Sequence, residues 1–203
     1  MRNSHMAKKI SCLTLSAVAA VWATAAMSQT SNSKEPVSIT TPSAPQGEGG
    51  SKMSGQTSVS KADRKLYAKL AEGNLAEIDV SKQALSKSND QEIKTFAQHM
   101  IDDHGMALDQ LATLARNKGV DLPSVPDEKH RKMAERMADM SPIDFNKQYA
   151  QSAVVDHRAT LKLLDKITSS AKDEDLKSLA EKMKPKVQSH LKAALDLTAG
   201  SSR

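Results

Sequence analysis

Cysteine and aromatic residues are scarce in this chain of 203 residues. It has one cysteine, Cys12, and one tryptophan, Trp22, and aromatic residues make up 2% of the sequence. Both residues lie within the first 28 positions, so removal of that segment would leave a protein without a thiol. Such a protein can form no disulfide and can carry out no thiolate catalysis.

Valine and isoleucine are also sparse after residue 60, where leucine, alanine, lysine, methionine and glutamate dominate. This composition favours helices over strands. The segment from residue 60 onward has roughly 140 residues, enough for a single domain with one core.

A large excess of positive charge is absent as well. The formal net charge is +5, but Arg2, Lys8 and Lys9 account for three of the 29 basic residues. Removing them leaves 26 basic residues against 24 acidic ones, a net charge of +2. Lysine and glutamate alternate on what the periodicity predicts to be solvated helix faces, so we expect no nucleic-acid partner.

The first 28 residues have the pattern of a secretory signal peptide. Three basic residues precede an uncharged, apolar stretch over residues 10–26 that is rich in small side chains. This pattern predicts export to the periplasm or cell envelope. The apolar stretch is near the lower length limit for a membrane-spanning helix, so an uncleaved anchor that gives membrane association is the alternative.

Residues 29–59 consist mainly of serine, threonine, proline, glycine and glutamine. A segment with so few large apolar residues cannot bury enough surface to order itself. We therefore predict a flexible linker at 29–59 and a folded domain at 60–198.

Apolar residues recur with a period of 3.6 in four long segments of this domain, which predicts four helices. Their expected ranges are 61–87, 90–117, 141–169 and 173–197. The first and last connections are short, which predicts two antiparallel hairpins. The middle connection of about 22 residues is long enough to run the length of the bundle and includes a short helical piece at 127–140. We therefore predict an all-α fold, a ferritin-like four-helix bundle with a long crossover, with simple up-down-up-down topology as the alternative.

One motif occurs twice in the predicted helices. FAQHMIDDH at Phe96–His104 returns 53 residues later as YAQSAVVDH at Tyr149–His157. At about 100° per residue, both histidines fall in the middle of an apolar helix face. A single histidine in that position is usually a core residue with a hydrogen-bond partner. Two in matching positions, each preceded by aspartate, suggest a shared site.

Two further ligand-type residues lie on apolar faces of the other helices. His190 lies on the face formed by Leu179, Met183 and Val187, and Glu77 lies in the apolar face of the first helix. Gly73 lies one turn before Glu77 and would let a neighbouring helix or side chain come close. Together, these positions predict that Glu77, His104, His157 and His190 converge at the bundle centre.

These residues also resemble a known family, the bacterial exported "predicted outer membrane protein" family, a ferritin-like domain of unknown function. The resemblance covers about residues 60–197. It rests on Glu77, Asp103-His104, Asp156-His157, Pro185 with His190, the GNLAEI stretch at 73–78 and the KGVDLP turn at 118–123. It implies a ferritin-like bundle in the cell envelope and implies no reaction.

Three imidazoles and a carboxylate form a plausible coordination sphere for Zn, Cu or Fe. Asp103 and Asp156 flank the apolar faces and would either bind the metal or orient a histidine of a neighbouring helix. The di-iron motif of ferritins requires Glu-x-x-His, but Ile101 and Val187 stand three residues before His104 and His190. Enzymatic activity of the ferroxidase or oxygenase type is therefore not predicted.

A metal-free interpretation uses the same residues. Buried polar groups need partners, and the histidines, aspartates and glutamate could satisfy one another in a hydrogen-bonded network within a structural or stress-related envelope protein. His99 and His130 are expected to be exposed and receive no role. The sequence leaves the oligomeric state open.

Overall fold

The computed structural model describes residues 58–200, and this part of the chain is helical, with five helices and no strand. The helices are α1 (Lys61–Lys87), α2 (Gln91–Asn117), α3 (Glu128–Ala138), α4 (Pro142–Ser170) and α5 (Glu174–Gly200). The prediction of an all-α fold is confirmed. The four long helices begin and end within about three residues of the positions expected from periodicity.

Polar side chains cap the helices where the sequence predicts a start. Ser60 accepts a hydrogen bond from the Asp63 N–H (3.0 Å) at the start of α1, and Ser141 precedes Pro142 at the start of α4. Asp90 caps α2 by accepting from the N–H groups of the two helical residues after Gln91. Gly119, just after α2, has φ of +62°, a conformation that glycine adopts without strain.

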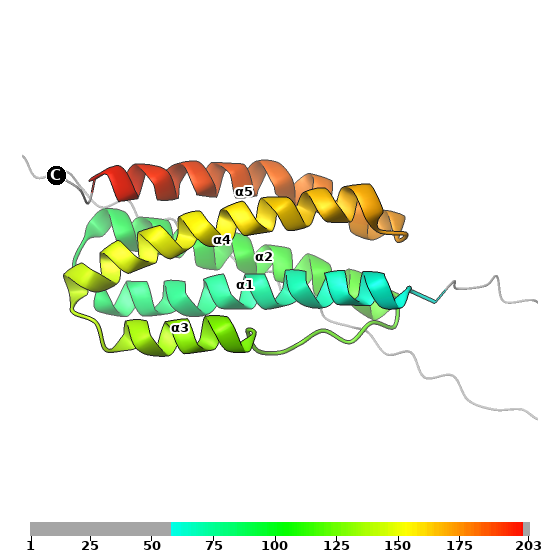
Figure 1. The fold of residues 1–203 in the computed structure, drawn as a ribbon, viewed down its shortest axis with the longest axis horizontal. Helices are drawn as coiled ribbons and strands as arrows, with labels where there is room; N and C mark the ends of the chain where they lie inside the picture. Colours follow the sequence, from blue (N-terminus) through cyan, green and yellow to red (C-terminus); the bar gives the residue numbers. More distant parts are fainter. Residues whose placement is uncertain (1–57, 201–203) are drawn as a thin grey trace, which may run out of the picture. The chain divides into compact units, whose positions relative to one another are not determined.

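The long helices pair as two hairpins, α1 with α2 and α4 with α5 (Figure 1). α1 also packs beside α4, and α2 packs beside α5, while α3 lies against α1 and α4. Arg64 near the start of α1 donates to the Gly119 carbonyl oxygen (2.8 Å), and Lys87 at the end of α1 donates to the Ala138 carbonyl oxygen (2.7 Å). The connection from α2 to α4 therefore begins at one end of α1 and reaches its other end.

Two apolar clusters form the core, one toward each end of the bundle. The first contains Leu70, Leu111 and Leu164, and the second contains Phe96 and Tyr149 among its buried side chains. Met137 of α3 belongs to the second cluster, and Met133 and Met140 pack against it. On α2, α4 and α5, the segment between the two clusters carries a buried histidine.

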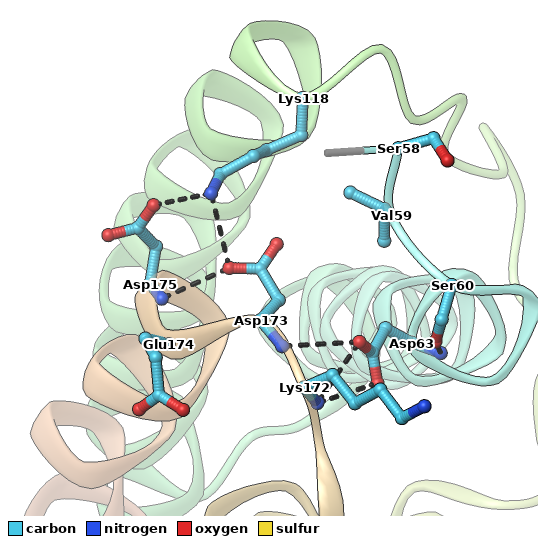
Figure 2. A pocket seen from close by; sticks show the side chains of 9 residues that line it. All are labelled: Ser58, Val59, Ser60, Asp63, Lys118, Lys172, Asp173, Glu174 and Asp175. Carbon is cyan, nitrogen blue, oxygen red and sulfur yellow. Dashed lines mark hydrogen bonds and ion pairs between the residues drawn. The ribbon is translucent and has the colours of Figure 1, made fainter. Parts of the chain in front are cut away.

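A buried carboxylate joins the start of α1 to the turn between α4 and α5 (Figure 2). The side chain of Asp63 accepts from the backbone N–H groups of Lys172 (3.1 Å) and Asp173 (3.2 Å). Asp173 in turn accepts from the Tyr67 hydroxyl (3.0 Å) and forms an ion pair with Lys118 (3.3 Å). Three segments that are distant in sequence are thus fixed at this end of the bundle.

The predicted signal peptide at 1–28 and nearly all of the predicted linker at 29–59 lie outside the described residues. Within residues 58–200, no helix combines the length and the apolar character that crossing a bilayer requires.

We predict that Asp63→Ala lowers the free energy of unfolding by about 1–3 kcal/mol, because it leaves buried N–H groups without an acceptor. Chemical denaturation followed by circular dichroism measures this loss. Asp79→Ala, at an exposed position of the same helix, is the control and should change stability by less than about 0.5 kcal/mol. Equal stability of the two variants would show that the Asp63 hydrogen bonds are unimportant.

Candidate metal centre

Three histidines from three helices meet between the two apolar clusters. His104 of α2, His157 of α4 and His190 of α5 are all buried, with exposures of 6%, 1% and 6%. Their ring centroids lie 5.3–5.5 Å apart in all three pairs. One potential ligand atom from each side chain lies within 4.8 Å of those from the other two. This buried triad could hold a metal ion.

The ring of His104 is oriented by α1. Its Nδ1 lies 2.9 Å from the Asn74 side-chain oxygen, and the Asn74 amide nitrogen donates to the Leu70 carbonyl oxygen (2.7 Å). Because the amide nitrogen is committed to Leu70, the oxygen is the atom that faces His104. An amide oxygen only accepts, so Nδ1 of His104 carries the proton and Nε2 carries a lone pair.

The other two rings are oriented in the same manner by different acceptors. His157 Nδ1 donates to the Ala153 carbonyl oxygen one turn earlier in α4 (2.8 Å). His190 Nε2 donates to the Asp103 carboxylate (2.8 Å), which lies on α2 next to His104. The lone pairs are therefore on Nε2 of His157 and on Nδ1 of His190.

Within residues 58–200, the nitrogens that carry the lone pairs have no hydrogen-bond partner. They are Nε2 of His104, Nε2 of His157 and Nδ1 of His190, and all three are buried. A buried polar atom without a partner costs about 1–3 kcal/mol, so three at one place need a physical explanation. Lone pairs of neutral imidazoles are the donors that transition metals bind, and the residues therefore fit a metal ion.

Burial keeps these imidazoles in the neutral form. Desolvation, reinforced by the neighbouring histidines, lowers the pKa of His104 to about 3. Desolvation also lowers the pKa of His157 to about 4. The pKa of His190 is lowered by burial as well, although the hydrogen bond to Asp103 opposes this shift. At neutral pH the triad thus holds three uncharged rings in the protonation state that a metal requires.

Glu77 lies beside the triad but outside the group of ligand atoms. It is buried, as predicted, and its Oε1 is 3.6 Å from His157 Nδ1, the nitrogen that bonds to Ala153. Glu77 is therefore near the side of His157 that faces away from the lone pair. Desolvation, together with the charge of Asp156, raises the pKa of the Glu77 carboxyl to about 8.

The two aspartates of the repeated motif have different partners. Asp103 orients His190 across the α2–α5 interface and forms an ion pair with Lys186 (3.2 Å). Burial opposes the ionisation of Asp103, but the bonds to His190 and Lys186 outweigh it and lower the pKa. Asp156 instead lies 3.5 Å from His130 of α3 and orients no histidine of the triad.

His130 differs from the expectation of an exposed residue without a role. Its side chain is 19% exposed and lies between Asp156 and Asp127, with Nδ1 2.6 Å from Asp127. These two carboxylates raise the pKa of His130 to about 9, despite partial burial. His99 is exposed, as predicted.

Asn74 was not identified as a site residue from the sequence, and the role expected for Gly73 was wrong. The buried face of α1 passes through Asn74, whereas a Cβ added at Gly73 would meet nothing within 4 Å. Among residues 58–200, no helix or side chain approaches closely at Gly73, contrary to our expectation. A polar residue three positions before Glu77 on an otherwise apolar face was the signal that could have identified Asn74.

Residues 49–197 match a family described as Domain of unknown function (DUF4142). The chain belongs to this family. No curated protein and no solved structure matches it. The expectation of a domain of unknown function is confirmed, while the ferritin-like and outer-membrane parts of the resemblance remain predictions.

We predict that NMR of the metal-free protein will distinguish the triad from His130. The imidazole ¹⁵N shifts of His104 and His157 should report neutral rings at pH 5, with the proton on Nδ1 in both, because burial lowers their pKa values. His130 should remain protonated at pH 8, because its pKa is raised to about 9. A triad that titrates near the unperturbed pKa of about 6.5 would contradict the burial argument.

Proposed function

We propose that this protein binds a transition metal ion, with His104, His157 and His190 as the ligands. The observation that supports this function is the set of three buried ring nitrogens whose lone pairs have no partner among the residues that the structure describes. Neutral imidazoles bind Zn, Cu and Fe, which are the candidate metals. Three protein ligands leave a coordination position for water or a small ligand, the arrangement found in catalytic rather than closed structural zinc sites.

Asp103 and Glu77 act as positioning residues in this proposal. Asp103 accepts the outward N–H of His190, which fixes the ring and raises its basicity. Glu77 lies close to the outward nitrogen of His157, where it is placed to support that ring rather than to bind the metal directly. Asn74 has the corresponding role for His104.

The metal-free network explains only part of this arrangement. Each histidine does have a hydrogen-bond acceptor, as that interpretation requires. The acceptors, however, satisfy one nitrogen of each ring, and in the described part of the chain the second nitrogen of each ring has no partner. A network built for stability alone would have no reason to bring three such atoms together.

A ferritin-like topology is also part of our proposal. It is supported by the path from α2 to α4, which begins near Arg64 at the start of α1 and reaches Lys87 at its end. A histidine triad replaces the carboxylate-rich di-iron motif. Export to the cell envelope remains a prediction that rests on the first 28 residues.

We predict that metal binding raises the melting temperature by mass action. Zn²⁺, Cu²⁺ and Fe²⁺ are added separately to the purified metal-free protein without a tag, and thermal unfolding is followed by circular dichroism. The increase should disappear in His104→Ala and His157→Ala, because each substitution removes a ligand. His99→Ala, at an exposed histidine outside the triad, should retain it. A wild-type transition that no metal shifts would favour the metal-free network.

We further predict that Asp103→Asn weakens metal binding by about 10–100-fold, because the ring of His190 loses a charged acceptor. Competition with a chelator of known affinity measures the change. Asp102→Asn is the matched control, since Asp102 is the exposed preceding residue and, among the described residues, accepts a hydrogen bond from Gln98 alone. Equal metal affinities of the two variants would show that Asp103 does not support metal binding.

A further inference from the structure

A pocket of about 250 Å³ opens between α1, α4 and the segment that leads into α3. Its lining includes Gly73 and Glu77 from α1, Asp127 and His130 around the start of α3, and Asp156 from α4. Three larger pockets in the described part of the chain include neither Glu77 nor a histidine of the triad in their linings. This pocket therefore brings solvent close to the centre.

Glu77 separates the pocket from the histidines. It lines the pocket, and its Oε1 lies 3.6 Å from the ring of His157. The side chain is more than nine-tenths buried, and within residues 58–200 its carboxyl group makes no hydrogen bond. Rotation of this carboxyl group would therefore break no hydrogen bond. The barrier between pocket and triad is thus the layer formed by Glu77 and His157.

Gly73 accounts for the open space above Glu77. Glycine inside a helix costs about 1 kcal/mol relative to alanine. No close packing explains this residue, because a Cβ at this position would meet nothing within 4 Å. Gly73 lines the pocket, so any larger side chain at this position would project into it. The missing side chain is what keeps the pocket open.

Acidic and basic side chains both line the pocket. Glu72, Asp127 and Asp156 are balanced by Lys69, Lys129 and His130, which its carboxylate partners keep protonated. The lining therefore has no net positive charge that would oppose the entry of a metal ion.

We propose that this pocket is the route by which a divalent metal ion enters and leaves the histidine centre, with Gly73 keeping it open and Glu77 forming its inner gate. The inference rests on the proposed metal-binding function. It assigns the pocket a kinetic role, because the ligands that set the affinity lie beyond it.

The test is a comparison of rates with equilibrium affinity, using Co²⁺ as the probe, because its absorption spectrum reports coordination. Stopped-flow mixing measures uptake, and excess EDTA measures release. Gly73→Leu should slow both rates by at least about tenfold, the effect of ~1.4 kcal/mol on a barrier. The dissociation constant should stay within about threefold of the wild-type value, because one barrier is crossed in both directions. Gly73→Ala should have a much smaller effect.

Gly105→Leu is the matched control. Gly105 is also a helical glycine with open space around its Cβ position, and it lies next to His104, but it does not line the pocket. The uptake and release rates of Gly105→Leu should equal those of the wild type. Ala159→Leu narrows the same pocket from an exposed position of α4. If Gly73→Leu does not fold, the uptake and release rates of Ala159→Leu test the route instead.

Wild-type uptake and release rates in both Gly73→Leu and Ala159→Leu would overturn the proposal that this pocket is the route. The proposed metal centre would be unaffected by that result. A higher dissociation constant with an unchanged uptake rate would also overturn it, because Gly73 would then act on the centre itself. Co²⁺ binding by the wild-type protein is measured before the variants are compared. Absence of binding would overturn both the proposed function and the proposed route.

Discussion

The constraint on which the centre depends is the burial of three imidazole rings within 5.5 Å of one another. Desolvation removes the charged form, so each ring has one N–H group and one lone pair. The N–H group must find an acceptor, and each does. The lone pair cannot take up a proton at neutral pH because the resulting charge would be buried. A metal ion is an electrophile that could satisfy all three lone pairs at once.

The bundle supplies this centre with an asymmetric set of supports. Helices α2, α4 and α5 provide the rings, whereas α1 provides no ring and contributes Asn74 and Glu77. The apolar clusters lie on either side of the layer that holds the rings. The hydrogen bonds of Asp63 and Asp173 tie α1 to the α4–α5 turn, which holds the supporting helix in register with the helices it supports.

Helix ranges and the inward position of three histidines could be predicted from sequence, because a period of 3.6 determines which face of a helix is apolar. The position of Glu77 relative to the ring of His157 could not be predicted, because periodicity identifies the face of a helix but not the rotamer of a side chain. Asn74 was missed because its neighbour Gly73 fits the same spacing. The contact of His130 with Asp156 depends on how α3 docks, and the spacing of apolar residues within α3 contains no information about that.

The two carboxyl groups beside the triad differ in ionisation because their surroundings differ. Asp103 is partly exposed and has two cationic or donor partners, so it stays ionised on the α2–α5 side. Glu77 is buried without a hydrogen bond in the described part of the chain, and its pKa of about 8 makes it mainly neutral at pH 7 on the α1–α4 side. A cation arriving through the pocket would therefore meet an uncharged carboxyl group first, because the ionised carboxylate lies on the other side of the triad, where it is paired with Lys186.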